Sequence, residues 1–161
     1  MSLKPKRILI VALVCLLSVC LLGCSSVMSE KETYAYDDLK SLIGMVKAPD
    51  TFVLRGDILG ISVDSEDKHP GEYTFIEYSA ANSFGTPLRG VAMFKDHRYI
   101  GDMNDDVDSI DDSDEKLEFL ATRLVFLGLR LVGGDTDHVK HEWFDGAKFA
   151  NKLGVEFEKT E

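Results

Sequence analysis

The spacing of apolar residues divides most of the chain into one helical segment and a series of strands. Leu39, Leu42, Ile43 and Val46 recur at i, i+3, i+4 and i+7, which predicts an amphipathic helix over residues 36–47. From residue 51 apolar and polar positions alternate, as is typical of strands with one buried face. The alternating segments cover residues 51–63, 73–82, 88–95 and 99–103, and the first changes parity at Gly56, which predicts a bend. Their short connections predict an antiparallel meander with the helix on its apolar face.

The last third of the chain returns to a helical pattern. Asp112 and Glu115 have the spacing of a capping pair and open a long segment with an apolar face. The residues of this face, which we expect to line the core, are Leu117, Leu120, Ala121, Leu124 and Leu127. Asp145 and Gly154 bracket a shorter helix. The predicted fold class is α+β: an N-terminal helix packed on a four-stranded antiparallel sheet, followed by one long and one short C-terminal helix.

The first residues have the character of an export signal. Lys4, Lys6 and Arg7 precede an almost wholly apolar stretch over residues 8–23, and no acidic residue occurs among them. A basic start followed by an apolar stretch is typical of a secretory signal peptide. The stretch falls short of the ~20 apolar residues that a membrane-spanning helix needs, so the pattern favours a cleaved signal over a permanent span.

The end of the apolar stretch, Leu21-Leu22-Gly23-Cys24, resembles the signal of bacterial lipoproteins. The resemblance implies cleavage between Gly23 and Cys24 and a diacylglyceryl group on the Cys24 sulfur, with further acylation holding the protein on the extracytoplasmic face of the cell membrane. It predicts a signal peptide over residues 1–23, a tether over 24–34 and a single domain over 35–161. The alternative is an ordinary signal peptide, or an uncleaved anchor, with a cysteine there by chance.

Charge and cysteine content narrow the classes of partner. The formal net charge is −10, and removal of Lys4, Lys6 and Arg7 with the signal lowers it to −13. An acidic domain repels phosphate backbones, so a nucleic-acid partner is not expected. All three cysteines lie at or before Cys24, which leaves the domain without a disulfide or a cysteine nucleophile. Cysteine-free exported domains favour a Gram-positive-type envelope.

An acidic run over residues 102–115 is the strongest chemical signal in the domain. Carboxylates at this density suit a hard cation such as calcium. The positions that match EF-hand spacing are Asn104, Asp106, Asp108, Asp112 and Glu115. The loop departs from an EF-hand because Ser109 replaces the turn glycine and Asp111 an apolar residue. The alternative, which these departures favour, is a solvated acidic loop whose last residues cap the long helix.

Trp143 and Phe144 form the one aromatic cluster with polar neighbours. Aromatic residues are enriched in binding sites and even more in cores. They are therefore either a binding surface or core residues, with Trp143 docking the last helix, and the core is the favoured interpretation.

Catalytic motifs are missing from the sequence: it has no Gly-x-Ser-x-Gly elbow, no phosphate-binding loop and no His-Glu-x-x-His pair. The sequence therefore predicts a non-enzymatic lipoprotein that binds a protein or peptide of the cell envelope. The alternatives are a calcium- or cation-binding lipoprotein that uses residues 102–115 and a cell-wall hydrolase. No cofactor is expected beyond the lipid on Cys24, and the oligomeric state is left open.

Overall fold

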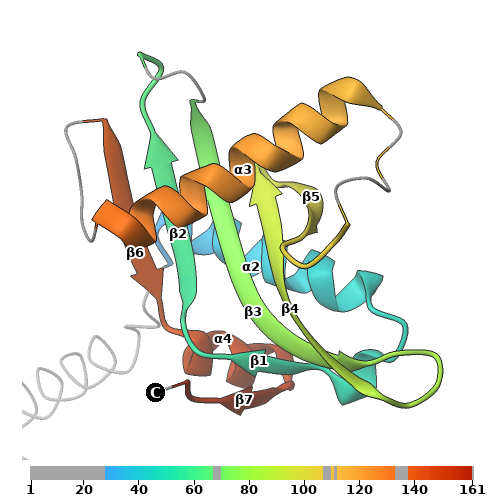
Figure 1. Cartoon of the computed structure of the whole chain (residues 1–161). Coiled ribbons are helices and arrows are strands. Elements are labelled where there is room, and N and C mark those ends of the chain that lie inside the picture. The colour runs from blue at the N-terminus through green and yellow to red at the C-terminus, as the bar shows by residue number, and fades with distance from the viewer. Residues whose placement is uncertain (1–27, 67–69, 107–109, 111, 133–137, 161) are drawn as a thin grey trace, which may run out of the picture.

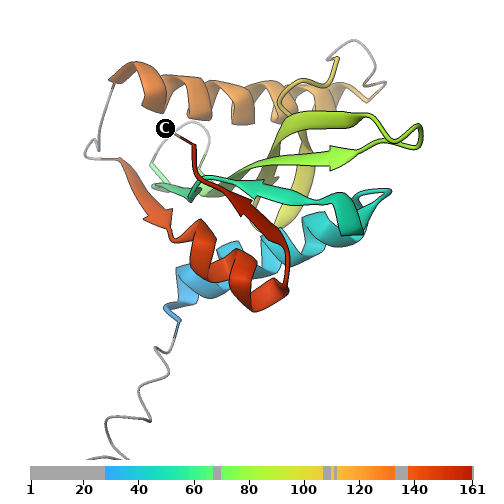
Figure 2. The same cartoon turned by 90° about the horizontal axis from the view of Figure 1, so that it is seen from below.

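The computed structural model describes residues 28–66, 70–106, 110, 112–132 and 138–160, which form one sheet with helices on both faces (Figure 1). This part of the chain contains three α-helices and seven strands. Helix α3 (Ser113–Val132) crosses one face of the sheet, whereas α2 (Glu30–Met45) and α4 (Gly146–Leu153) cover the other face (Figure 2). The α+β class is as predicted, but the sheet is larger than expected.

Helix α2 begins at Glu30, inside the segment over residues 24–34 predicted as a tether. The cause is a capping box: the Ser29 hydroxyl accepts a hydrogen bond from the Glu32 backbone N–H, and the Glu32 carboxylate accepts one from the Ser29 N–H. Leu39 and Leu42, from the predicted apolar face, are buried against the sheet. A 3-10 turn over Pro49–Thr51 then leads into the first strand.

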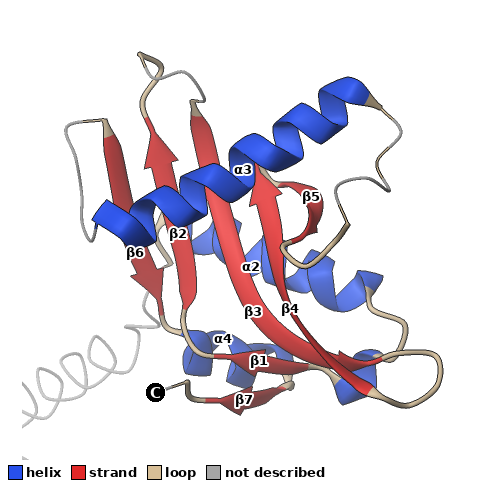
Figure 3. Cartoon of the chain, in the orientation of Figure 1, coloured by secondary structure: helices blue, strands red, loops and turns tan. Residues whose placement is uncertain are grey.

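The predicted meander forms the centre of the sheet (Figure 3). Its strands are β1 (Val53–Arg55), β2 (Ile58–Val63), β3 (Gly71–Ala81), β4 (Pro87–Lys95) and β5 (Arg98–Asp102). The bend predicted at Gly56 separates β1 from β2, and Gly56 has the left-handed φ of 72° that glycine tolerates best. Because of this bend, β1 and β2 pair antiparallel with different halves of the long strand β3.

The prediction of a four-stranded, wholly antiparallel sheet is wrong, because two further strands come from the C-terminal region. Strand β6 (Val139–Phe144) pairs antiparallel with β2, and β7 (Glu156–Glu158) pairs parallel with β1. Strand β6 lies at the edge of the described sheet, so its polar residues Lys140, His141 and Glu142 need no burial and give no clear alternation. Strand β7 has only three residues, too few for a periodic signal.

Two hydrophobic clusters fill the layers on either side of the sheet. Between the sheet and helices α2 and α4 lie residues such as Leu39, Ile76 and Phe149. Between the sheet and α3 lie residues such as Ile61, Phe75 and Phe119. Every member of both clusters falls between residues 28 and 157, so the chain from residue 25 onward retains the whole described core.

Helix α3 packs on the sheet through its aromatic side and not through its leucines. Phe119 is 1% exposed, Thr122 is fully buried, and the centroids of the Phe126 and Phe75 rings lie 4.7 Å apart. The expectation that Leu117, Leu120 and Leu124 line the core is therefore wrong, whereas Ala121 is buried as expected. The helix has two apolar sides, and the bulkier phenyl rings fill the space above β3. The side chain of Leu127, expected on the same face, lies outside the described residues.

Helix α4 confirms both of its predicted ends. The Asp145 carboxylate accepts a hydrogen bond from the Lys148 backbone N–H, and Gly154 ends the helix with a left-handed φ of 71°. Phe149 points into the cluster beneath the sheet and is completely buried.

Candidate functional site

The outer side of α3 carries a row of exposed leucines. Leu117, Leu120 and Leu124, which we call the leucine stripe, are 63%, 38% and 65% exposed. A buried leucine is the common case, and an exposed contiguous apolar row is the informative one. The spacing of three and then four residues keeps all three side chains on one side of the helix.

Contacts below the leucine stripe fix the rotation of α3 about its axis. The Glu118 carboxylate forms an ion pair with Lys95 at 3.7 Å and another with Arg98, both on the β4–β5 hairpin. The Arg123 guanidinium lies 5.2 Å from the centre of the Phe119 ring. These interactions and the buried aromatic side direct the stripe away from the sheet.

The first turn of α3 is held by the predicted cap. The Asp112 carboxylate accepts hydrogen bonds from the backbone N–H groups of Glu115 and Asp114 at 3.0 and 2.8 Å. These two bonds favour the charged form and lower the pKa of Asp112. Asp112 therefore acts as a helix cap, as the solvated-loop interpretation of the acidic run expected.

The leucine stripe and the start of the domain lie on opposite faces of the sheet. In Figure 2, α3 lies above the sheet, whereas α2, the first described helix, lies below it. A surface that lies close to α2 is therefore separated from the leucine stripe on α3 by the thickness of the sheet.

Sequence reasoning did not identify the leucine stripe as a surface, although the signal was present. Phe119, Thr122 and Phe126 also recur at i, i+3 and i+7, so α3 has two apolar rows on opposite sides. Only one row can pack on the sheet. The larger side chains indicated which row that would be, since aromatic residues bury the most area.

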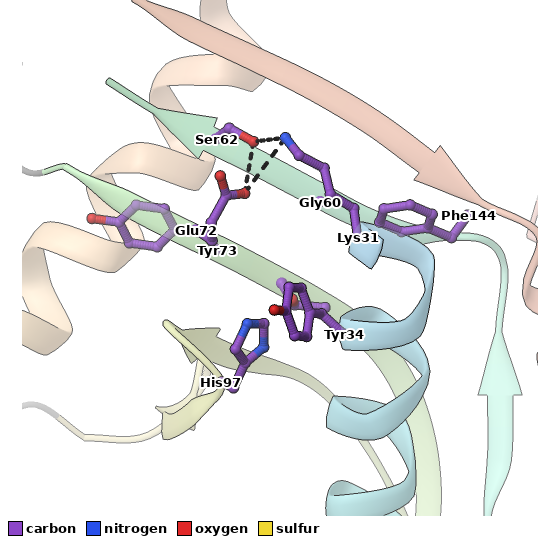
Figure 4. A pocket seen from close by; sticks show the side chains of 9 residues that line it. Lys31, Tyr34, Gly60, Ser62, Glu72, Tyr73, His97 and Phe144 are labelled. Atoms are coloured by element: carbon purple, nitrogen blue, oxygen red, sulfur yellow. Dashed lines mark hydrogen bonds and ion pairs between the residues drawn. The ribbon is translucent and has the colours of Figure 1, made fainter. Parts of the chain in front are cut away.

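A small pocket between α2 and the sheet is lined by several polar side chains (Figure 4). At one end, the Ser62 hydroxyl donates a hydrogen bond to the Glu72 carboxylate at 2.6 Å and accepts one from the Lys31 ammonium. At the other end, the His97 ring packs against the Tyr34 ring in a tilted arrangement, with centroids 4.1 Å apart. The free volume of about 20 Å³ has room for about one water molecule, so these groups join α2 to the sheet and leave no space for a substrate.

His97, which lines this pocket, contacts a buried carboxyl group. Asp38 is 2% exposed, and one of its carboxylate oxygens lies 3.4 Å from His97 Nδ1. Burial raises the pKa of Asp38, while the Thr74 hydroxyl and His97 partly oppose that shift. His97 thus faces Asp38, and Ser62 is bonded to Lys31 and Glu72, so the serine and the histidine are not arranged as a nucleophile and its base.

Trp143 and Phe144 have different environments, although both lie on β6. Phe144 is buried in the cluster beneath the sheet, as the core interpretation expects. Trp143 is 59% exposed and lines a shallow pocket with Gly56, Asp57 and Phe157. The interpretation of Trp143 as a core residue that docks the last helix is therefore wrong, because alternation along β6 turns its side chain to the other face of the sheet.

The candidate calcium ligands do not converge in the part of the chain that the structure describes. Asp112 caps α3, Glu115 is exposed in its first turn, and the Asn104 side chain donates to the Arg89 carbonyl. Asp108 lies outside the described residues. Among those that are described, no three Asp, Glu, His or Cys side chains form a group able to hold a metal ion.

The lipidation signal, Gly23 and Cys24, also lies outside the described residues. Within them, no helix combines the length and the apolar character that a membrane crossing requires. Comparison of the chain with models of protein families, with curated proteins and with solved structures gives no match.

Proposed function

We propose that the protein is a lipid-anchored lipoprotein whose domain binds another protein or a peptide of the cell envelope through the leucine stripe. The observation that carries the proposal is the exposure of Leu117, Leu120 and Leu124 on a domain whose core is complete without them. Apolar rows of this kind, bordered by polar residues, mark interaction surfaces more often than accidental exposure.

The anchor in this proposal is Cys24. Acyl chains contribute about 0.8 kcal/mol per buried methylene, and stable attachment takes two anchoring signals, which a diacylglyceryl cysteine supplies. The protein would then lie on the extracytoplasmic face of the cell membrane, in an envelope of the Gram-positive type.

The short link between Cys24 and the domain favours a protein partner over the bilayer for the stripe. Five residues separate Cys24 from Glu30, where α2 begins, so the link reaches about 20 Å at full extension. A domain of this size has a radius of gyration of about 14 Å, hence a diameter of about 35 Å. Because α2 and α3 cover opposite faces of the sheet (Figure 2), a link of this length keeps the stripe turned away from the membrane.

A binding role also agrees better with the size of the polar pocket in Figure 4 than catalysis at that pocket does. The pocket in Figure 4 has room for about one water molecule, too little for the sugar or peptide substrate of a cell-wall hydrolase. A calcium-binding role has less support, because the described members of the acidic run do not converge on one point.

Two measurements in cells test the proposal. Metabolic labelling with palmitate should label the protein, and cell fractionation should recover the protein with the membranes. Cys24→Ser should remove both the label and the membrane attachment. A photo-crosslinking amino acid at position 124 should give one discrete protein adduct in intact cells. The matched control is position 88, because Leu88 is an equally apolar residue, 55% exposed, on β4. Absence of adducts from positions 117, 120 and 124, or equal adducts from position 88, would contradict the proposal.

A further inference from the structure

The leucine stripe has the spacing of a coiled-coil seam. Leu117, Leu120 and Leu124 occupy successive a, d and a positions of a heptad repeat, and the sequence continues the same spacing at Leu127 and Leu131. In a coiled coil such a row packs against a second helix, each leucine inserting between four side chains of its partner. In the described structure no element covers Leu117, Leu120 or Leu124, so this seam lacks its second helix.

A basic row follows one side of the leucine stripe. Lys116, Arg123 and Arg130 recur every seven residues, which places them at the g positions beside the leucines. The e positions on the other side are Asp114 in the first turn and then the small residues Ala121 and Gly128. The other carboxylates of α3 lie elsewhere: Glu115 in its first turn, and Glu118 in ion pairs with the β4–β5 hairpin.

We propose that the leucine stripe binds one amphipathic α-helix of another protein, with an apolar heptad seam and acidic residues along the flank that meets Arg123. This inference rests on the proposed function and specifies the class of partner. The apolar seam supplies the area removed from water, and the acidic flank supplies charge complementarity to the basic row.

Charge argues against a second copy of this chain as the occupant. In an antiparallel pair the g positions of the two helices meet, so Arg123 would face its own copy and the basic rows would repel each other. In a parallel pair each g residue meets the e position of the following heptad, so Arg123 would face Gly128, which offers no carboxylate. A partner with acidic flanks meets the basic row favourably in either orientation.

The test uses the chain from residue 25 onward and two synthetic helical peptides of four heptads. Both peptides carry leucine at the a and d positions; one has glutamate and the other lysine at every e and g position. Each peptide repels its own copies and so stays available for binding. Fluorescence anisotropy of the labelled peptides should show that the glutamate peptide binds at least tenfold more tightly than the lysine peptide. The difference should shrink at high salt.

Variants of the protein connect this binding to the leucine stripe. Leu117→Gln combined with Leu124→Gln should weaken binding of the glutamate peptide at least tenfold, whereas Leu88→Gln should leave it unchanged. Both proteins should give the native circular dichroism spectrum, because all three leucines are largely exposed. Arg123→Gln should reduce the preference for glutamate over lysine several-fold.

Three results would overturn the inference. The first is equal affinity for the two peptides, or affinity that survives the double leucine substitution. The second is a dimer in sedimentation equilibrium that the double substitution dissociates, which would assign the stripe to a second copy. The third is binding of the same chain to phosphatidylglycerol vesicles that the double substitution abolishes, which would assign it to the membrane. If position 124 gives a discrete adduct in cells but neither peptide binds through the stripe, this inference fails and the proposed function still holds. The partner would then have a shape other than a single amphipathic helix.

Discussion

Replacing Leu124 by alanine should barely change the stability of the domain, although Leu124 belongs to the most regular apolar row in the chain. Leu124 is 65% exposed, so only about a third of its surface leaves water on folding. Burying a whole leucine side chain contributes about 1.5–3 kcal/mol, so Leu124→Ala should cost about 0.5–1 kcal/mol. The higher helix propensity of alanine offsets a few tenths of a kcal/mol of that cost.

The matched comparison is Phe119→Ala on the opposite side of the same helix. Phe119 is 1% exposed, and truncation of a buried phenylalanine costs about 3–5 kcal/mol. Urea unfolding followed by far-ultraviolet circular dichroism resolves the two effects. With a slope of about 2 kcal/mol per molar urea, Leu124→Ala should move the midpoint by no more than ~0.5 M and Phe119→Ala by about 1.5–2.5 M. A loss above ~2 kcal/mol for Leu124→Ala with less than ~1 kcal/mol for Phe119→Ala would mean that α3 packs through its leucines, and it would remove the basis for the stripe.

Three further predictions concern the rest of the domain. Burial raises the pKa of Asp38, so the native state binds a proton there more tightly than the unfolded chain does, and the stability from this group falls as pH rises from about 4. Asp38→Asn should therefore flatten the dependence of the unfolding free energy on pH, measured by urea unfolding. The same pH dependence in the native chain and the variant would contradict this. Asp112 has a lowered pKa, so its capping contribution to stability is present above about pH 4 and is lost in acid. Asp112→Ala should lower the Tm at neutral pH, and the Tm values of the variant and the native chain should converge at low pH. A difference in Tm that does not change with pH would refute the cap. A side chain at Gly146 would meet the Gly56 carbonyl oxygen at 2.2 Å, so Gly146→Ala should cost about 1–3 kcal/mol in urea unfolding. The control is Gly44→Ala, which has open space around it and should stabilise α2 by about 0.5–1 kcal/mol. Equal effects of the two substitutions on stability would refute the close approach.

Periodicity predicted the elements whose two sides differ strongly. Leu39 and Leu42 on α2 alternate with exposed polar residues, and the strands of the meander each have one apolar face, so pattern alone identified them. Asp145 and Gly154 identified α4 because caps depend on local backbone chemistry and not on distant contacts. Strands β6 and β7 could not be found in this way, because an edge strand tolerates polar residues and a three-residue strand has no period.

The candidate site was less predictable than the fold. The leucines of α3 and its phenylalanines satisfy the same helical spacing, and only the space available above Phe75 decides which side is buried. The exposure of Trp143 depends on which face of β6 it occupies, and that register is set by pairing with β2, a strand about eighty residues away. The acidic run illustrates the opposite case, since Asp112 was predicted as a cap from its spacing to Glu115 alone.

The pairing of β7 with β1 has a consequence for the order in which the molecule can form. The Arg55 guanidinium binds the Glu158 carboxylate with both of its terminal nitrogens, across 103 positions of the chain. Strand β1 therefore gains its parallel neighbour only after residues 156–158 have been synthesised. Contacts of such high sequence separation slow folding, so this edge of β1 stays unpaired until β7 is in place, and loss of residues 156–158 would leave it bare.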